Sequence, residues 1–258
     1  MIESIDNPLV KLVKKLSQKK YRDEMGLFVI EGPHLIEEAL KSGSSIKNVL
    51  ITIEKHKDLA DKLVEQNISY DFISEQIMEI ISDTLTPQGI LAVVEKKQIS
   101  LESITHKKPF LVICDAIQDP GNLGTIIRTA AAAGCSGMIL SNDCVDLYNP
   151  KTIRSTGGNL FHIPIADDVD IKQYILQLKS NGVVVAGTTG SEGVSLYKCK
   201  LTGNLAVLIG NEGSGVKEQL LEICDIKLNI PMVSNVESIN AAGAASIIIY
   251  EAYRQRHQ

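Results

Sequence analysis

The feature that most constrains this chain is the alternation of short apolar segments with helical segments through residues 110–256. Apolar runs of four or five residues are typical of buried strands, and apolar residues spaced three and four apart are typical of helices. Their alternation predicts an α/β fold for this part of the chain. We expect strands at 110–114, 137–140, 183–187, 205–209 and 226–230, and helices at 123–133, 171–180, 216–222 and 238–256.

A separate and smaller α/β pattern precedes it. We expect a basic amphipathic helix at 8–20, further helices at 33–39, 58–66 and 74–81, and strands at 27–30, 46–53, 70–73 and 90–94. The segment between the two patterns (KKQISLESITHKK, 96–108) is polar and weakly periodic, and Pro109 follows it. Such a composition shift is typical of a linker. The predicted organisation is a small N-terminal domain at 1–96, a linker at 97–108 and a second domain at 109–258.

Composition excludes several classes of protein. The net charge is −5, from 26 basic and 31 acidic residues, which argues against a general electrostatic coat for nucleic acid. Aromatic residues make up 4% and tryptophan is absent, so a surface of stacking platforms for single strands is not expected. What remains is an enzyme, or a binding module whose specificity is local.

Neither a membrane span nor export is expected. The longest stretch without charged residues, 129–142, is shorter than the roughly 20 residues that a spanning helix needs. No apolar segment follows the N-terminal charges, so we expect no signal peptide and a cytoplasmic location. The five cysteines are scattered without CxxC spacing, so we expect no metal site and no disulfide.

Three glycine-rich segments each follow a predicted strand. In the first, residues 115–134, Pro120 and Gly121 precede a helix start, where free backbone N–H groups can hold an anion. Arg128 lies about one turn beyond Gly124 in an otherwise uncharged helix. A lone cation in such a helix must reach a polar cleft or be paired. Spacing alone leaves open the alternative of an ordinary turn with a surface arginine.

The second segment, 207–216, has glycines spaced GxxGxG and one carboxylate, Glu212. Glycine permits close backbone approach to a ligand, but this spacing is not the GxGxxG of dinucleotide-binding folds. The third segment, 228–246, leads through Ser238 and Asn240 into a run of small residues. Such a run is typical of tight packing or an oligomer interface. A serine nucleophile is disfavoured because no GxSxG surrounds Ser238.

Taken together, the three segments resemble a known family. They read Asn122-x-Gly124-x-x-x-Arg128-x-Ala130, then Gly210-x-Glu212-Gly213-x-Gly215, then Ile230-Pro231-x6-Ser238-Ile239-Asn240. In this order they resemble the three motifs of the SpoU (TrmH-like) RNA ribose 2′-O-methyltransferases of the SPOUT superfamily. The N-terminal domain resembles that family's RNA-binding extension at Phe28–Gly32. One departure is Ile239, where the family more often has leucine, and an apolar contact is kept.

The resemblance implies a fold, a cofactor and a quaternary structure. The expected catalytic domain is an α/β knot, a mainly parallel sheet with a C-terminal trefoil knot, which no general sequence argument would choose. It would bind S-adenosyl-L-methionine, need no metal and act as a homodimer through the C-terminal domain. The implied cofactor-binding residues are Thr188, Gly210, Ile230, Met232 and Ile239. The implied catalytic residues are Asn122, Arg128, Glu212, Ser238 and Asn240.

The resemblance also implies roles for these residues. The family proposal makes Arg128 the general base, but arginine normally stays protonated, so a bidentate grip on an RNA phosphate is an equal alternative. Glu212 would orient Arg128 or accept the proton, while Asn122, Ser238 and Asn240 would hold the geometry. RNA contacts are expected from the basic N-terminal helix, and the alternative is a solvated helix face. The residues concerned are Lys11, Lys14, Lys15, Lys19, Lys20 and Arg22.

The predicted function is methyl transfer to a ribose 2′-hydroxyl of RNA. Ribosomal RNA is preferred because this N-terminal extension is commoner among the rRNA enzymes of the family. Transfer RNA is the first alternative. A non-catalytic RNA-binding or ribosome-assembly protein on the same fold is the second, and it predicts a damaged cofactor loop or loss of Arg128. Both are intact in this sequence.

Overall fold

The computed structural model describes the whole chain except residues 53–55, 106–107, 191–192 and 234–237. Its contacts divide the chain into two units. Unit 1 consists of Met1–Lys97 and Tyr148–Phe161, and unit 2 consists of Gln98–Leu147 and His162–Gln258. This division assigns residues 148–161 to the first unit, whereas the sequence-based scheme places them in the second domain.

Unit 2 is built on a seven-stranded sheet with the order β7-β6-β5-β10-β8-β11-β9, in which neighbouring strands are parallel. The central strands β5, β6 and β10 are buried along their whole length, which explains why they are continuous apolar runs in the sequence. The strands are β5 (Phe110–Cys114), β6 (Gly137–Ser141), β7 (Ile165–Val169), β8 (Val184–Thr188), β9 (Val194–Ser195), β10 (Leu205–Ile209) and β11 (Ile226–Asn229).

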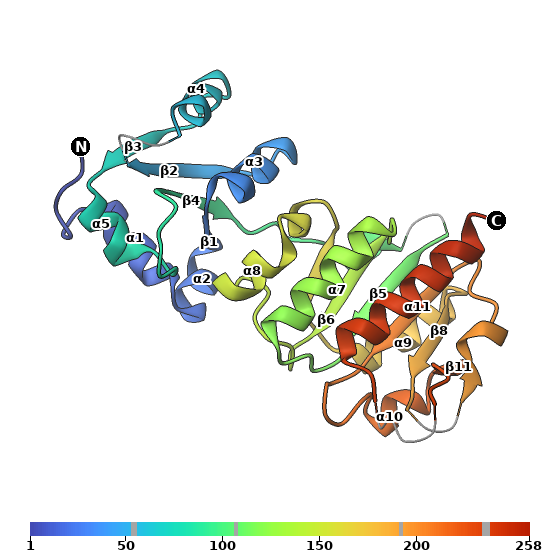
Figure 1. Ribbon diagram of the computed structural model, residues 1–258. Coiled ribbons are helices and arrows are strands. Elements are labelled where there is room, and N and C mark those ends of the chain that lie inside the picture. Colours follow the sequence, from blue (N-terminus) through green and yellow to red (C-terminus); the bar gives the residue numbers. More distant parts are fainter. Residues whose placement is uncertain (53–55, 106–107, 191–192, 234–237) are drawn as a thin grey trace. The chain divides into compact units, whose positions relative to one another are not determined.

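Helices cover both faces of this sheet (Figure 1). The long helices α7 (Pro120–Ala132) and α11 (Ala241–Arg256) lie side by side, and the Thr129 and Ser246 hydroxyls are hydrogen-bonded at 3.1 Å. Residues of α9 (Ile171–Ser180), α10 (Glu218–Leu221) and α6 (Leu101–Ile104) share a core cluster with β5, β6, β8 and β10. The mainly parallel α/β prediction is therefore confirmed. The trefoil knot stays a prediction.

The short helix α6 lies within the segment predicted as a linker. Its Ile104 is only 2% exposed and packs closely on Gly137 at the beginning of β6, where an added Cβ would lie 2.8 Å from the Ile104 side chain. A few apolar residues anchor this polar segment to the core of unit 2. The elements β7, β9, α8 (Pro150–Thr156) and two short 3-10 helices, η1 (Asn159–Phe161) and η2 (Leu196–Lys198), have no counterpart in the sequence-based prediction.

Unit 1 contains a four-stranded sheet with the order β1-β4-β2-β3. Only β2 and β3 are parallel, and the two other pairs are antiparallel. The strands are β1 (Leu27–Glu31), β2 (Ile46–Thr52), β3 (Tyr70–Ile73) and β4 (Ile90–Glu95). The helices are α1 (Pro8–Leu16), α2 (Lys19–Met25), α3 (Pro33–Lys41), α4 (Lys57–Glu65) and α5 (Glu75–Ile81). The last residue of the predicted strand 46–53 lies outside the described residues.

The predicted helix at 8–20 is wrong in its extent, because it is two helices. Helix α1 ends at Leu16 and α2 begins at Lys19, with Gln18 in an extended conformation between them. The Arg22 guanidinium donates hydrogen bonds to the carbonyl oxygens of Leu16 and Ser17, at 2.7 and 2.8 Å. It thereby satisfies carbonyl groups that the end of α1 leaves without helical partners.

The segment 148–161 completes the core of unit 1. Its Tyr148 and Phe161 rings lie 4.6 and 6.4 Å from the ring of Phe28 on β1. The ammonium group of Lys96 lies 4.6 Å from the centre of the Tyr148 ring. An aromatic cluster of this kind contributes beyond its buried area, so unit 1 depends on residues from two separate parts of the sequence.

Candidate active site in unit 2

A pocket in unit 2 lies where the carboxyl ends of β8, β10 and β11 meet. It has a volume of about 290 Å³. Its walls are the segments that follow these three strands, together with the first turns of α11. The carboxyl edge of a parallel sheet is the usual position of ligand sites in α/β folds, because the connecting loops converge there.

The pocket brings together residues that the sequence places far apart. All five predicted cofactor-binding residues line it, and so do the predicted catalytic residues Glu212 and Ser238. The five are Thr188, Gly210, Ile230, Met232 and Ile239. A single concave site therefore contains most of the residues carried over from the three motifs.

Gly210 is required by the shape of the pocket wall. The following loop closes on itself, because Asn211 and Gly215 exchange two backbone hydrogen bonds of 3.0 Å. A Cβ added at Gly210 would overlap the backbone of Gly215 and Val216. Because the obstacle is backbone, no change of rotamer can relieve it. The pocket wall is therefore a tight turn that can form only if residue 210 is glycine.

Glu212 is a hydrogen-bond acceptor for the loop that leads into α7. One carboxylate oxygen accepts from the Asn122 side chain at 2.9 Å and from the Asp119 backbone N–H at 3.1 Å. The other oxygen accepts from the Gln118 backbone N–H at 3.2 Å. Glu212 thus ties the pocket wall after β10 to the loop after β5, the neighbouring strand of the sheet.

Asn240 extends this network to α11. Its Nδ2 donates to Asn122 Oδ1 at 3.0 Å, while its Oδ1 accepts from the backbone N–H groups of Ala242 and Gly243. It is therefore the N-cap of α11. The predicted helix start at Ser238 differs from the observed cap by two residues. Three predicted catalytic residues, Asn122, Glu212 and Asn240, form one hydrogen-bonded chain.

Burial raises the pKa of Glu212, but the hydrogen bonds from Asn122 and from the Asp119 and Gln118 backbone outweigh it, so the pKa lies below its ordinary value. Glu212 is accordingly a carboxylate at neutral pH. A carboxylate that already accepts several hydrogen bonds is a weak base. This favours a role for Glu212 in holding the site together over a role in accepting the proton.

The variant Glu212→Gln should lower the free energy of unfolding by about 1–2 kcal/mol at pH 7, because the amide N–H₂ group would face backbone donors. A carboxylate with a lowered pKa stabilises the fold above its ordinary pKa of about 4.3 and loses that contribution as the pH falls through the lowered value. The difference between variant and wild type should therefore shrink below about pH 4. Urea unfolding at several pH values measures it, with the exposed Glu222→Gln as control. A pH-independent difference would contradict this account.

Arg128 is exposed on α7, two turns beyond Asn122. Among the residues that the structure describes, no carboxylate pairs with it, and Glu212 makes its contacts elsewhere. The expectation that Glu212 orients Arg128 therefore has no contact to support it. A cation that is not neutralised by the protein remains available to an anionic ligand.

Carboxylates neutralise more of the positive charges in the basic N-terminal segment than the sequence indicates. Arg22 is 3% exposed and bonded to backbone carbonyls, so its prediction as an RNA contact is wrong. Carboxylates pair with Lys11, Lys19 and Lys20, at distances of 2.7, 3.0 and 3.8 Å. Lys14 and Lys15 are exposed in the last turn of α1, and no described carboxylate pairs with them.

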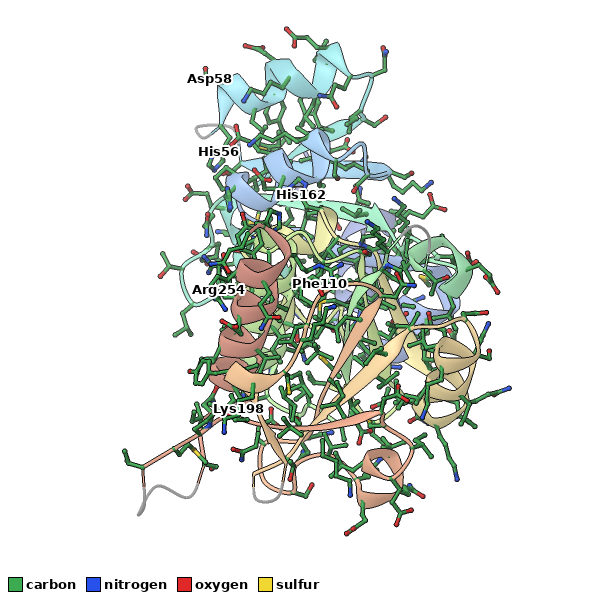
Figure 2. The ribbon with its side chains drawn as sticks, turned by 90° about the vertical axis from the view of Figure 1, so that its right-hand side faces the viewer. His56, Asp58, Phe110, His162, Lys198 and Arg254 are labelled. Carbon is green, nitrogen blue, oxygen red and sulfur yellow. The ribbon has the colours of Figure 1, made fainter. Side chains whose placement is uncertain are left out.

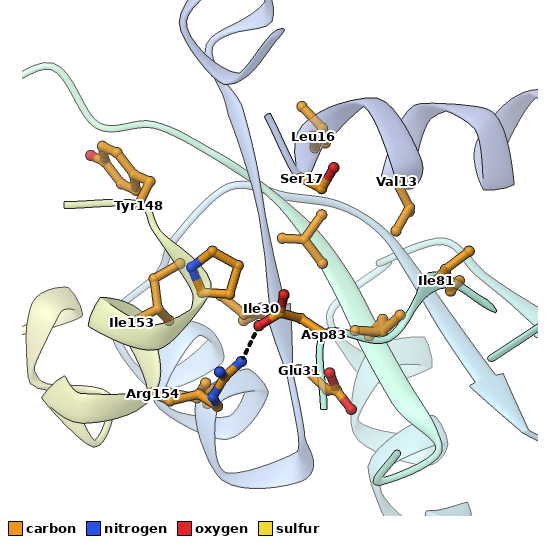
Figure 3. Close-up of a pocket in the computed structure, with 14 residues that line it drawn as sticks. Val13, Leu16, Ser17, Ile30, Glu31, Ile81, Asp83, Tyr148, Ile153 and Arg154 are labelled. Carbon is orange, nitrogen blue, oxygen red and sulfur yellow. Dashed lines mark hydrogen bonds and ion pairs between the residues drawn. The ribbon is translucent and has the colours of Figure 1, made fainter. Parts of the chain in front are cut away.

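Unit 1 contains a smaller pocket, of about 50 Å³, that the sequence did not reveal (Figure 3). Apolar residues of α1, β1, α3, α5, β4 and the segment 148–153 form most of it. The ion pair between Arg154 and Asp83, at 2.8 Å, lies beside it. The buried carboxylate of Glu31 accepts hydrogen bonds from the Ser82 and Thr84 hydroxyls. With so small a volume, this pocket is secondary to the site in unit 2.

Sequence reasoning missed three residues that shape the main site. Asp119 accepts a hydrogen bond from the Asn122 N–H at 2.8 Å and is the N-cap of α7, a role that an aspartate directly before Pro120 could have revealed. Gln118 acts through its backbone, and the Asn211 side chain bonds to both loops. Neither gives a signal in spacing or composition.

In the described part of the chain, neither metal-binding side chains nor reactive thiols form a second candidate site. No group of three or more metal-binding side chains occurs among the described residues. Burial raises the pKa of Cys135 to about 12 and that of Cys224 to about 11, so these thiols are protonated and unreactive at neutral pH. Figure 2 labels Arg254 of α11. This arginine is paired with Glu251 at 2.8 Å. None of the helices in the described ranges has the length and apolarity needed to cross a membrane.

Two family models and a curated relative match the chain. Residues 109–250 match the SpoU rRNA Methylase family, and residues 7–92 match the MRM3-like substrate binding domain. The 23S rRNA (guanosine(2553)-2′-O)-methyltransferase RlmP of Bacillus subtilis is 41% identical over 249 residues, covering 96% of this chain and 97% of that protein.

Two solved structures resemble the chain over nearly its whole length. The AdoMet-bound rRNA methyltransferase of Sinorhizobium meliloti has a TM-score of 0.89 at 33% identity, with 98% of this chain and 97% of that one covered. The SpoU methyltransferase AviRb of Streptomyces viridochromogenes, in complex with AdoMet, has a TM-score of 0.88 at 28% identity, with 98% and 99% covered. With its three motifs gathered at one edge of a parallel sheet and a family match over more than half of its length, the chain belongs to the SpoU rRNA methylase family.

Proposed function

We propose that this protein transfers the methyl group of S-adenosyl-L-methionine to a ribose 2′-hydroxyl of ribosomal RNA. The observation that carries the proposal is the pocket lined by residues of the second and third motifs, to which the Asn240–Asn122–Glu212 hydrogen-bonded chain ties the first motif. Ribosomal RNA is favoured over transfer RNA because the Bacillus and Sinorhizobium proteins are both named as rRNA methyltransferases. A cytoplasmic location is part of the proposal and depends on that substrate.

The pocket fits the proposed cofactor. Its volume of about 290 Å³ suits a small organic molecule, and its walls combine apolar side chains with exposed backbone. Ile230 and Ile239 offer apolar surface to an adenine ring, and the tight turn from Gly210 to Gly215 offers backbone polar groups. When bound, the cofactor supplies a methyl group that the sulfonium centre already activates for transfer.

The protein's contribution is to position the ribose, whose 2′ proton passes to water during the transfer. A 2′-hydroxyl is a poor nucleophile while protonated, and alignment with the methyl group supplies much of the rate. We assign Arg128 to the RNA side, where its guanidinium grips a phosphate next to the reacting ribose. Asn122, Asn240 and Glu212 hold the loop and helix ends around the site. Ser238, exposed at the pocket edge, offers a hydroxyl to the substrate.

We propose that unit 1 contacts the RNA backbone through Lys14 and Lys15. The double variant Lys14→Ala/Lys15→Ala should weaken RNA binding about tenfold at physiological salt and reduce the slope of log affinity against log salt by about two. Filter binding at several salt concentrations measures both quantities. Lys41→Ala is the control, because Lys41 is already paired with Glu38 at 2.7 Å. Equal losses in the two variants would contradict the assignment.

We also propose a homodimer formed through the C-terminal domain. Ile247, Tyr250 and Tyr253 are spaced three apart on α11 and are 37, 49 and 37% exposed. Such a stripe of large apolar side chains is typical of an interface. Tyr250→Lys should therefore shift the protein toward monomers in light scattering. Leu176→Lys, at an exposed apolar position of α9, should not. A monomeric wild type with full activity would contradict the proposal.

Mapping ribose methylation across total RNA, with and without the protein, tests the activity. We expect one 2′-O-methyl group in ribosomal RNA to depend on the protein, detected by mass spectrometry of nuclease fragments. Calorimetry with S-adenosylmethionine tests the alternative of a non-catalytic RNA-binding protein. Absence of cofactor binding would favour that alternative, although the intact Gly210 turn and Arg128 argue against it.

A further inference from the structure

Ala116 adopts a strained backbone conformation at the entrance to the site. It follows the end of β5 in the loop that leads into α7, and its φ of 54° lies in the left-handed region. Residues with a Cβ pay a steric cost there, of roughly 1–2 kcal/mol. Such a conformation persists only where the surrounding structure holds it. Ala116 therefore needs partners that offset the strain.

Two side chains, one from the end of β6 and one from the loop after β10, hold Ala116. Its N–H donates to Ser141 Oγ at 2.9 Å, and its carbonyl oxygen accepts from Asn211 Nδ2 at 2.8 Å. Ser141 is the last residue of β6, and Asn211 is the second residue after β10. Both polar groups of the strained residue are thus satisfied by the two strands that flank β5 in the sheet.

Asn211 has a second set of partners in the pocket wall. Its Oδ1 accepts from the N–H groups of Gly213 and Ser214, at 2.9 and 3.1 Å. The donor side of this amide therefore holds the loop before α7, while the acceptor side holds the glycine turn of the pocket. Because an amide has both functions, replacing it with a carboxylate removes the first and keeps the second.

We propose that Asn211 is a positioning residue for methyl transfer, acting by clamping Ala116 in its left-handed conformation. The inference rests on the proposed function. Release of Ala116 would change the direction of residues 117–119, whose N–H groups at 118 and 119 bond to Glu212. It would thereby displace the first turn of α7, which carries Asn122. The donor side of the Asn211 amide acts on the reaction through this loop.

The variant Asn211→Asp removes the clamp, together with the longer bond of 3.4 Å that Asn211 Nδ2 donates to Glu212 Oε2. It keeps the oxygen that holds Gly213 and Ser214, loses the donor to Ala116, and places a carboxylate oxygen against a carbonyl oxygen. We expect kcat to fall about tenfold to hundredfold, as for loss of one buried hydrogen bond with an unsatisfied partner. The dissociation constant for S-adenosylmethionine, measured by calorimetry, should change by less than about threefold.

Ala116→Gly provides the matched rescue. Glycine adopts a positive φ without steric cost, so residue 116 then needs no clamp. Alone, this variant should retain close to wild-type kcat. In the Asn211→Asp background it should restore most of the lost kcat, a recovery that a general loss of stability would not produce. Hydrogen exchange supplies a readout independent of activity: Asn211→Asp should speed exchange of the amides of Gln118, Asp119 and Asn122 and leave 213–214 protected.

Several results would overturn the inference. These are full kcat in Asn211→Asp, absence of rescue by Ala116→Gly, unchanged exchange of the amides at 118, 119 and 122, and a loss of cofactor affinity in proportion to the loss of kcat. The last would make Asn211 a cofactor-binding residue instead. Failure of the proposed function is distinguishable from failure of this inference. If the wild type methylates no RNA but the clamp exists, Asn211→Asp would still exchange these amides faster than the wild type.

Discussion

Replacing Arg128 with alanine is expected to lower kcat for RNA methylation by roughly a thousandfold or more, the size of effect seen when a group that acts in the transition state is removed. The side chain is exposed, lies on α7 beyond the Asn122 network, and has no ion-pair partner among the described residues. Its charge is therefore free to act on the RNA. The affinity for S-adenosylmethionine should be largely kept, because Arg128 does not line the pocket.

Arg128→Lys distinguishes the two roles considered for this residue. Lysine keeps the positive charge but loses the planar, bidentate geometry of the guanidinium. If Arg128 grips a phosphate, the lysine variant should retain part of the activity and show a raised KM for RNA. If it takes the proton, KM should change little and kcat should fall. Equal loss of cofactor binding and methyl transfer in Arg128→Ala would instead make the residue structural.

Gly210→Ala is expected to abolish binding of S-adenosylmethionine, with an affinity at least about a hundredfold lower, corresponding to about 2.7 kcal/mol. The added methyl group would overlap the backbone of Gly215 and Val216, so the turn that forms the pocket wall must open. The turn cannot open without losing the hydrogen bonds between Asn211 and Gly215. Calorimetry of cofactor binding measures the effect, and circular dichroism checks the fold.

The same loop contains the control for this prediction. A Cβ added at Gly213 would meet Asn211 Oδ1 at 3.6 Å, an ordinary van der Waals distance, and Gly213 does not need a positive φ. Gly213→Ala should therefore bind the cofactor within a few-fold of wild type. If both variants bind normally, the glycine turn does not form the cofactor site. If both fail, the loop is sensitive to any side chain and the steric account of Gly210 is wrong.

Local pattern was sufficient to predict most of unit 2. The strands β5 and β10 and the helix α9 have the predicted bounds, because a buried strand or an amphipathic helix repeats its signal along the segment itself. Strands with weaker signals were missed. β7 carries two adjacent aspartates, and β9 has only two residues. Pairing with a neighbouring strand, which sequence spacing does not report, stabilises both.

Contacts between distant residues could not be predicted from the pattern. Glu212 and Asn122 are 90 positions apart, and Asn240 and Asn122 are 118 apart, so no window of sequence shows that their side chains meet. Only the motif resemblance grouped them. The burial of Arg22 illustrates the opposite failure. An arginine in a run of lysines is expected on a charged surface. Arg22 is instead buried and donates hydrogen bonds to the carbonyl groups at the end of α1.

Because unit 1 consists of two separate segments of the chain, it limits where the protein can be divided into fragments. Its core includes Tyr148 and Phe161, which the chain supplies only after it has entered unit 2 and returned. The chain therefore crosses between the units three times, after residues 97, 147 and 161. A fragment that stops at residue 97 would lack two aromatic partners of Phe28. Unit 1 therefore cannot be removed or replaced by cutting the chain at one position. Separating the units would require residues 148–161 to be kept with residues 1–97.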